Sequence, residues 1–283
     1  MLAAIKRQLD VLTGAVPGAL IPLPSAQPFD RKVVIDFTMR HYRVKTIDTA
    51  RELSEVLALR QAVFHVEFAK KWLSLSSDRS EYDDVADHLA IYDESVGRIV
   101  GVYRIIATHF SPIFYSATEF DISHFLKVPG RKIELSRACI APEYRTGAVI
   151  SLLWRGLADY ATKVQADYIF GLSSVTTMDL RQIAALTIYF EEMGLMDHGF
   201  GITPLPRYWL RDLGEMLTEC RSSRRDLREI EAKIPSLLKS YLKAGAKVCS
   251  FPVIDRQFKC TDFFTVLEMT KLSSAHGRRF AKT

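Results

Sequence analysis

Apolar and polar residues alternate along the chain in two different periods, which predict strands and helices in succession. Apolar residues at every second position, or in short runs, predict strands over residues 32–37, 42–47, 88–92, 98–107, 131–140, 167–175, 246–254 and 263–269. Apolar residues three or four positions apart predict helices over residues 49–68, 147–164, 180–192 and 221–244. We expect Pro235 to interrupt the last helix and Gly245 to cap it. The predicted fold class is α/β (α+β), a mixed central sheet flanked by helices.

The first 30 residues are expected to form an arm outside the main fold. Residues 2–13 can form a short amphipathic helix, and the stretch that follows is broken by Pro17, Pro22, Pro24 and Pro28. We expect residues 31–283 to form one domain, with a helical insertion over about residues 177–244 and a basic C-terminal region.

Composition adds the class of protein to this picture. Apolar residues make up 48% of the chain and charged residues 25%, which is typical of a globular protein with a sizeable core. The four cysteines are scattered without a CxxC pair, so we expect reduced thiols in a cytoplasmic protein, and no metal site. No apolar run resembles a signal peptide or approaches the roughly 20 residues that span a bilayer.

Charge is unevenly distributed along the chain. Residues 221–283 carry 14 Lys and Arg against 6 Asp and Glu, whereas residues 1–220 carry 24 against 27. A basic C-terminal region predicts an anionic partner, such as a membrane surface, an acidic protein or nucleic acid, although a solvated basic face is an equal alternative. The arginines that we consider for contact with such a partner are Arg145, Arg221, Arg224, Arg225 and Arg228.

The most informative stretch is the strand over residues 131–140, which carries Glu134 and Arg137. Strict alternation would place these two side chains on opposite faces, whereas a β-bulge between them would bring both to one face. Unpaired buried charge is costly, so the two residues are either a structural ion-pair network or parts of a catalytic site. Arg104 lies on an otherwise apolar strand face and needs a carboxylate partner, for which Glu134 is a candidate.

Arg60 lies inside the apolar stripe of the helix over residues 49–68. A lone Arg there is most simply a salt-bridged residue, but Arg60, Phe64 and Trp72 together are candidates for lining a pocket. The acidic stretch over residues 74–87, which includes Asp83, can be solvated surface, a lid or a cation-recognising loop.

Several short motifs between residues 42 and 269 resemble those of one enzyme family. They are Asp87-His88-Leu89, Val100-Gly101-Val102-Tyr103-Arg104, Phe114-Tyr115-Ser116, Glu119-Phe120-Asp121 and Glu134-Leu135-Ser136-Arg137-Ala138-Cys139. Together they resemble the GNAT acyltransferase superfamily, and within it the hemolysin-like acyltransferases that include the ornithine lipid synthases. A more distant resemblance is to the acyl-homoserine lactone synthases, whose polar and aromatic positions are matched in order by Arg60, Phe64, Trp72, Asp83, Arg104, Glu134 and Arg137.

This resemblance implies a GNAT-like sheet and an N-acyltransferase activity. The implied reaction moves a (3-hydroxy)acyl chain from acyl carrier protein to the α-amine of an amino acid, with ornithine favoured, and gives a lyso-ornithine-type lipid. The implied partners are acyl carrier protein, the amino acid and an anionic membrane surface, without nucleic acid and with no cofactor beyond the phosphopantetheine thioester. The alternatives are an acyl-homoserine lactone-type signal synthase and a non-catalytic membrane-associated module.

Two departures from the family pattern bear on the substrates. Ser136 and Ala138 stand where the ornithine lipid synthases usually have Gly and Ser, which concerns the acceptor more than the acyl transfer. Residues 145–150 do not match the loop with which GNAT enzymes bind the coenzyme A pyrophosphate, and this favours acyl carrier protein as the donor.

The implied chemistry is aminolysis of a thioester. Glu134 is the first candidate to take the proton or orient the amine, with Arg137 and Arg104 holding it ionised or binding the acceptor carboxylate. Backbone N–H groups of a bulge near residues 136–139 are candidates for the oxyanion site. His88 is most simply a core histidine, and an acyl-enzyme on Cys139 is disfavoured because direct transfer needs no covalent step. The substrate-binding candidates are Arg60, Phe64, Trp72, Asp83, Asp87, His88, Ser136 and Cys139. We expect a cytoplasmic protein peripheral to the inner membrane.

Overall fold

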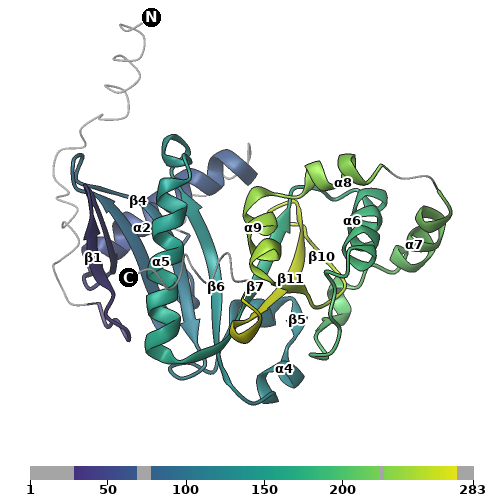
Figure 1. Ribbon diagram of the computed structural model, residues 1–283, viewed down its shortest axis with the longest axis horizontal. Coiled ribbons are helices and arrows are strands. Elements are labelled where there is room, and N and C mark those ends of the chain that lie inside the picture. The colour runs from purple at the N-terminus through teal and green to yellow at the C-terminus, as the bar shows by residue number, and fades with distance from the viewer. Residues whose placement is uncertain (1–28, 69–77, 224–225, 273–283) are drawn as a thin grey trace, which may run out of the picture.

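The computed structural model describes residues 29–68, 78–223 and 226–272, and most of their strands form one large sheet (Figure 1). Its order is β1 (Asp36–Met39), β2 (Tyr42–Thr46), β3 (Asp87–Asp93), β4 (Arg98–Ala107), β6 (Arg131–Ile140), β7 (Ala166–Val175), β11 (Cys260–Glu268) and β10 (Val253–Asp255). The short strand β9 (Lys247–Val248) also pairs with β11, and β5 (Phe120–Asp121) pairs with β8 (Thr203–Pro204) in a second sheet. Neighbouring strands of the large sheet are antiparallel except β6 and β7, so the sheet is mixed, as predicted.

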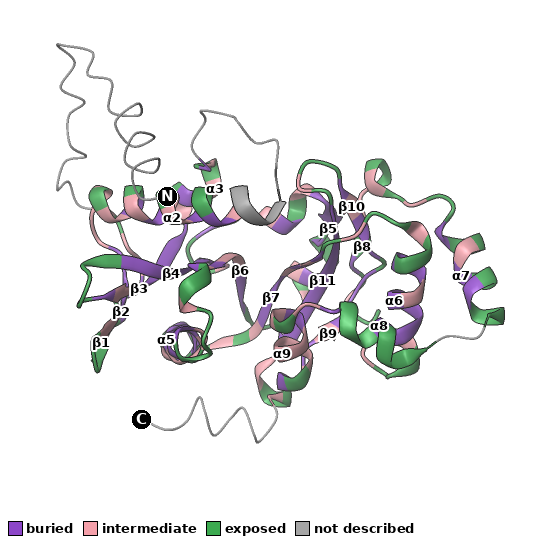
Figure 2. Ribbon diagram, turned by 90° about the horizontal axis from the view of Figure 1, so that it is seen from above, coloured by how far each residue is buried: buried purple, intermediate pink, exposed green. Residues whose placement is uncertain are grey.

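The two longest helices cover opposite faces of the sheet (Figure 2). On one face, α2 (Ala50–Phe68) packs Leu53, Val56 and Val63 against Val102 and Cys139 of the strands. On the other, α5 (Ala148–Val164) buries an apolar stripe in the largest core cluster of the described residues. We refer to these as the α2 face and the α5 face.

Further helical segments complete the fold. The α-helices are α3 (Glu81–Val85), α4 (Ser123–Lys127), α6 (Leu180–Glu192), α7 (Leu213–Ser222), α8 (Leu227–Lys233) and α9 (Ser236–Ala244). The 3-10 turns are η1 (Tyr115–Thr118), η2 (Pro142–Tyr144), η3 (Pro206–Tyr208) and η4 (Met269–Lys271). No helix within the described ranges is both long enough and apolar enough to cross a membrane.

Strands β6 and β7 part halfway along their length, and this divergence organises the centre of the molecule. They pair only from Arg131 to Glu134 of β6, after which β6 continues beside β4 and β7 continues beside β11 (Figure 1). Gly171 lies at the point of divergence, where an added Cβ would come within 2.3 Å of the carbonyl oxygen of Leu135. Only glycine therefore fits at this position without a shift of the backbone.

Most of the predicted elements are present, and the differences have physical reasons. The predicted strands over residues 98–107 and 131–140 and the predicted helix over residues 180–192 are confirmed at both ends. The first predicted strand begins later, at Asp36, because the preceding backbone amides of Lys32 and Val33 bond to the Asp87 carboxylate instead of a strand. The predicted interruption of the last helix at Pro235 is confirmed, because Pro235 separates α8 from α9. The start of that helix was predicted wrongly, since Arg221 belongs to the end of α7. Gly245 ends α9 with φ +111°, as predicted.

Candidate active site

A β-bulge on β6 changes the direction of its side chains. In the β4–β6 register, Val102 lies opposite Cys139 and Arg104 lies opposite Ser136, so a step of two residues on β4 is matched by three on β6. Within this interval Arg137 has φ +54°, a left-handed conformation that is costly for a residue with a Cβ. Of the two alternatives that the sequence left open, the structure has the β-bulge, and it falls between Ser136 and Cys139. Arg137 thereby contacts Phe64 on the α2 face, the face that Glu134 also occupies.

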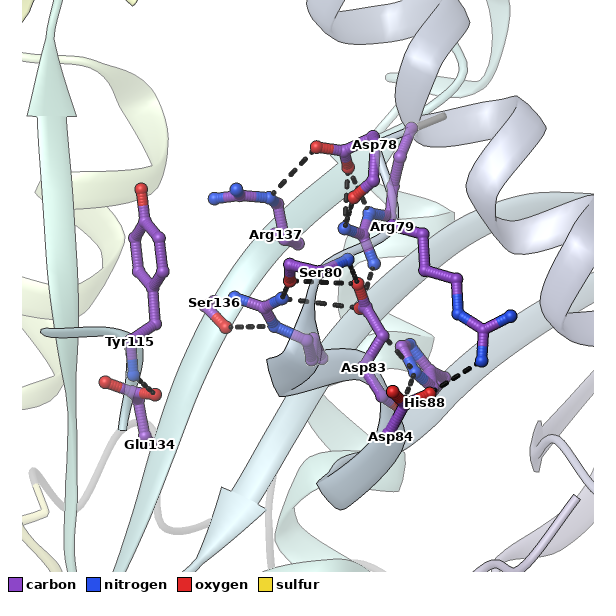
Figure 3. Close-up of polar contacts among 12 residues, drawn as sticks. Asp78, Arg79, Ser80, Asp83, Asp84, His88, Tyr115, Glu134, Ser136 and Arg137 are labelled. Carbon is purple, nitrogen blue, oxygen red and sulfur yellow. Dashed lines mark hydrogen bonds and ion pairs between the residues drawn. The ribbon is translucent and has the colours of Figure 1, made fainter. Parts of the chain in front are cut away.

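Glu134 is fully buried next to the first two residues of the 3-10 turn η1. Its two carboxylate oxygens accept hydrogen bonds from the backbone N–H groups of Tyr115 (2.8 Å) and Ser116 (2.7 Å), and the Ser116 hydroxyl donates a third. Burial raises the pKa of Glu134 even though these donors act to lower it. The carboxylate therefore fixes the position of Tyr115 (Figure 3).

The ring of Tyr115 contacts both arginines of the site. The Arg137 guanidinium lies 4.6 Å from the ring centroid, and the Arg104 guanidinium lies 5.4 Å from it. Both cations therefore contact the aromatic ring that Glu134 holds, which is a favourable cation–π arrangement. Burial raises the pKa of Tyr115 to about 12, although the charge of Arg137 acts against that change.

The partner of Arg104 is not Glu134, and this corrects the sequence prediction. Arg104 donates from Nε to the hydroxyl of Ser136 (2.9 Å) and from Nη1 to Ser80 (3.0 Å) and Asp83 (3.3 Å). Glu134 lies two register pairs further along, opposite Ile106, where its oxygens accept hydrogen bonds from the η1 amides. Burial lowers the pKa of Arg104 to about 10, and the charge of Arg137 acts in the same direction.

Asp83 is the centre of a buried ion-pair network rather than part of a solvated loop. Its Oδ1 accepts from Arg60 (2.6 Å), and its Oδ2 accepts from the backbone N–H of Ser80 (2.7 Å) at the start of α3. Arg60 also bonds Asp78 from Nε at 2.6 Å, so its position inside the apolar stripe is stabilised by two carboxylates. Although burial opposes it, the guanidinium groups of Arg60 and Arg104 hold the pKa of Asp83 well below its usual range.

Asp78 links this network to Arg137. Its second oxygen, Oδ1, lies 3.5 Å from Nε of Arg137 (Figure 3). The Arg137 side chain also packs against the rings of Phe64 and Phe258, with centroids 5.8 and 5.6 Å from its guanidinium carbon. On balance the pKa of Arg137 is raised: burial acts to lower it, but Tyr115 and Asp78 outweigh that effect. Arg137 is therefore held as a cation between aromatic rings.

Two of the predicted residues are structural in their surroundings. His88 is fully buried, its Nε2 lies 3.3 Å from the carbonyl oxygen of Asp83, and burial lowers its pKa to about 4. A neutral core histidine, the simpler interpretation of the sequence, fits this environment. The Asp87 carboxylate accepts a hydrogen bond from the hydroxyl of Tyr160, which belongs to the α5 face. Asp87 is therefore directed away from the arginines, which lie on the α2 face. Burial raises its pKa.

The remaining predictions divide into buried, exposed and undescribed residues. Cys139 is buried in the α2-face core, and its Sγ donates to the carbonyl oxygen of Leu59 at 3.9 Å. Arg145 is exposed and donates to the carbonyl oxygen of Ile140 shortly before α5 begins. Arg221 and Arg228 are exposed on α7 and α8, and these two helices lie far from α5 (Figures 1 and 2). Trp72, Arg224 and Arg225 lie outside the described residues.

The sequence prediction missed Tyr115, Asp78 and Phe258 as contacts of Arg137. Tyr115 lies in the motif Phe114-Tyr115-Ser116, so the motif marked the segment without showing its role. Phe258 follows β10 near the C-terminal end, and its contact with Arg137 comes from the tertiary fold.

Comparison with known proteins places the chain among acyltransferases. The sequence model of the acetyltransferase (GNAT) domain matches residues 59–155, which include β6 and its bulge. The L-ornithine N(alpha)-acyltransferase of Rhizobium meliloti (strain 1021) is 32% identical over 244 residues, or 81% of this chain and 80% of that protein. The L-ornithine N(alpha)-acyltransferase of Agrobacterium fabrum (strain C58) is 30% identical over 254 residues, or 83% of this chain and 85% of that protein.

Among solved structures, a CoA-dependent acyl-homoserine lactone synthase, BjaI, matches with a TM-score of 0.45 and 15% identity, covering 82% of this chain and 83% of that one. A putative N-acetyltransferase from Lactobacillus plantarum matches with a TM-score of 0.44 and 11% identity, covering 81% and 99%. The sequence matches carry the assignment, because two relatives reach 30% identity over most of both chains. The chain belongs to the GNAT acyltransferases, in the family that includes the L-ornithine N(alpha)-acyltransferases.

Proposed function

We propose that this protein is an N-acyltransferase that moves a (3-hydroxy)acyl chain from acyl carrier protein to the α-amine of ornithine. The observation that carries the proposal is the bulge on β6, which brings Arg137 to the same face as Arg104 and Glu134 where β6 and β7 diverge. The names of the relatives support ornithine as the acceptor. The product of this reaction is an N-acylated amino acid of the lyso-ornithine lipid type.

The reaction needs a neutral amine, a stabilised oxyanion and alignment of the two substrates. The amine nitrogen attacks the thioester carbonyl carbon, the C–S bond breaks, and the proton lost by nitrogen leaves with the thiol or with water. An α-amine has a pKa of about 8, so a useful fraction is neutral near pH 7 and a weak base suffices. The protein must therefore supply mainly binding and charge stabilisation.

Arg137 is our candidate for binding a carboxylate or the developing oxyanion. The carboxylate ion-paired with it is Asp78, 3.5 Å from Nε, and this contact is longer than a charge-assisted hydrogen bond. The backbone N–H groups of the bulge between Ser136 and Cys139 are candidates for further donors. Both features lie on β6, so one strand presents side-chain and backbone donors together.

We assign Glu134 a positioning role in this reaction. Its oxygens are occupied by three donors of η1, which hold the Tyr115 ring in contact with Arg104 and Arg137. Arg60 and Asp83 help to fix the position of Arg104, because the Asp83 carboxylate accepts hydrogen bonds from both Arg60 and Arg104. Loss of Glu134 would displace the aromatic ring that both arginines contact.

Acyl carrier protein as donor and peripheral membrane association are further parts of the proposal. The exposed basic residues Arg221 and Arg228 on α7 and α8 provide a surface for an acidic partner, although Arg221 already pairs with Glu191 at 2.6 Å. Flotation with anionic and neutral vesicles tests the membrane part. Equal absence of binding to both kinds of vesicle contradicts it.

One experiment tests the central reaction. The full chain is incubated with 3-hydroxyacyl carrier protein or with the matching acyl coenzyme A, together with a panel of amino acids and S-adenosylmethionine, and the products are identified by mass spectrometry. We expect N-acylornithine, formed faster from the carrier-protein donor. A lactone formed only from S-adenosylmethionine would support signal synthesis instead. No acylated amine from any acceptor would refute an acyltransferase.

A further inference from the structure

A second cluster of buried charge lies beside the arginines, and it consists of carboxyl groups. Glu119 follows η1, Asp255 ends β10, and Asp262 belongs to β11. Glu119 and Asp262 are each 3% exposed, and Asp255 is 9% exposed. Ligand atoms of Asp255, Cys260 and Asp262 all lie within 4.8 Å of one another. The segment after η1 and the antiparallel pair β10–β11, which are far apart in the sequence, therefore bring acidic groups to one buried place.

Glu119 shows that the hydrogen-bonding capacity of this cluster is not satisfied within the cluster. Its carboxyl group interacts directly with that of Asp262, but its Oε2 is buried and has no hydrogen-bond partner among the described residues. Burial raises the pKa of Glu119, and the charges of Asp262 and Asp255 raise it further. A buried carboxyl oxygen without a donor costs free energy, so the site lacks a donor or a cation.

The acidic cluster and Arg137 lie around the same two aromatic residues. The electrostatic field of Glu119 and Asp262 reaches Tyr115, whose ring also contacts Arg137. Asp255 accepts from the backbone N–H of Phe258 at 3.0 Å, and the ring of Phe258 packs against Arg137. Arg137 and the carboxyl groups therefore lie near the same two residues, Tyr115 and Phe258.

Asp262 fixes the cluster relative to the divergence of the strands. It pairs in register with Ser174 of β7, beyond Gly171, where β7 no longer runs beside β6. Arg137 lies on β6, also beyond the last paired residue, Glu134. One end of this charge arrangement therefore lies on β6, and the other lies on β11, which is the neighbour of β7 beyond the divergence.

We propose that Glu119 and Asp262, backed by Asp255, bind the side-chain ammonium of the amino-acid acceptor, while Arg137 binds its α-carboxylate. The inference rests on the proposed function and adds the residues that select a cationic side chain. An ammonium group has three N–H donors and no acceptor, which suits a group of carboxyl oxygens. A site whose buried polar groups need that donor rejects an acceptor that lacks it far more strongly than an apolar pocket would.

The test compares ornithine with norvaline, which has the same carbon chain without the side-chain amine. Steady-state kinetics are measured on the full chain for wild type, Glu119→Gln, Asp262→Asn and the exposed control Glu215→Gln. We expect Glu119→Gln and Asp262→Asn to lower kcat/KM for ornithine by roughly 30-fold or more, because they break a buried charge pair. The kcat/KM for norvaline in these two variants should change by less than about 3-fold. The kcat/KM for ornithine in the control Glu215→Gln should likewise change by less than about 3-fold.

A second measurement keeps the inference testable if these variants fold poorly. Ornithine alone should raise the Tm of the wild type, and norvaline at the same concentration should not. Parallel losses for both acceptors in the variants, or equal shifts of Tm, would overturn the inference. Activity on ornithine that EDTA abolishes and a divalent ion restores would also overturn it, by making the cluster a metal site. If wild type acylates ornithine and norvaline equally well, this inference fails while acyl transfer stands; if it acylates no amine, the proposed function fails first.

Discussion

The carboxylate of Glu134 accepts a hydrogen bond of 2.7 Å from the backbone N–H of Ser116, and this bond ties the turn η1 to strand β6. Glu134→Gln would replace one acceptor oxygen by an NH₂ group that faces an N–H donor. We expect a loss of about 1–3 kcal/mol in the free energy of unfolding, measured by urea denaturation. Glu94→Gln, at an exposed hairpin position, should change it by less than about 0.5 kcal/mol.

The same variant separates positioning by Glu134 from proton abstraction. A positioning residue changes stability and kcat/KM together and leaves the pH profile of kcat in place. If Glu134 were the general base, Glu134→Gln would lower kcat by about 100-fold or more and remove the acidic limb of the profile. That second result with unchanged stability would contradict the role that we assign.

Arg137→Lys tests the planar guanidinium while keeping the charge. Both residues have a Cβ, so the cost of φ +54° is the same and backbone strain cancels in the comparison. Lysine cannot stack flat on Tyr115 or bind a carboxylate with two parallel bonds. We expect kcat/KM for ornithine to fall by about 10- to 150-fold, the equivalent of about 1.5–3 kcal/mol. Arg98→Lys, in an exposed pair with Glu143, is the matched control, and equal kinetics for the two variants would count against a role for Arg137.

The sequence predicted what depends on local pattern and missed what depends on register. Strand β6 could be placed because its apolar period is continuous, and the two charges of Glu134 and Arg137 raised a bulge as one of two alternatives. The position of the bulge could not be derived, because the extra residue can be inserted at more than one position along the strand with the same local pattern. The contact between Asp83 and Arg104 could not be derived either, since it depends on how α3 packs against β4 in the tertiary fold.

The acidic cluster shows the same limit more clearly. Glu119 appeared only as part of a motif, and nothing in the sequence near Asp262 indicates that its neighbour is the residue after η1. Their proximity follows from the order of the sheet, in which β11 lies beside β7 although it is last in the chain. Long-range charge pairs of this kind require the topology before they can be inferred.

Gly171→Ala tests the close approach of β6 and β7 where they diverge. An added Cβ would lie 2.3 Å from the carbonyl oxygen of Leu135, so the backbone must shift. We expect a loss of about 2–4 kcal/mol in the free energy of unfolding, the range of marked overpacking. Gly214→Ala in α7, where nothing lies within 4 Å of the new Cβ, should instead stabilise by about 0.5–1 kcal/mol. Equal effects of the two substitutions would contradict the close approach.

His88 gives a pH dependence of stability with a definite sign. Its pKa falls from 6.5 to about 4 on folding, mainly because burial disfavours the charged ring. The unfolded chain therefore takes up the proton first, so this contribution to stability is complete above about pH 6.5 and is lost as the pH falls toward about 4. The low pKa of Asp83 acts in a more acidic range.

The measurement compares wild type with His88→Gln in urea denaturation at about pH 7 and about pH 5. Wild type should lose on the order of 2 kcal/mol more than the variant over that interval. Carboxyl groups with raised pKa values act in both proteins and cancel in the difference. Equal losses in the two proteins would show that His88 does not titrate in this way.

The acidic cluster predicts a pH dependence for the acceptor that the α-amine cannot explain. Burial raises the pKa of both Glu119 and Asp262, and the charge of Asp255 adds to this while Arg137 opposes it at Glu119. The cluster therefore holds a proton near neutral pH, and an ammonium group can bind only when that proton leaves. The KM for ornithine should fall as the pH rises from about 6 to about 8, by up to about 10-fold per unit, while the side-chain amine stays charged. Titration of the α-amine affects norvaline equally, so the ratio of the two KM values isolates the cluster. A ratio that does not change with pH in wild type would contradict the prediction, and in Glu119→Gln the slope should become shallower because one of the two proton sites is gone.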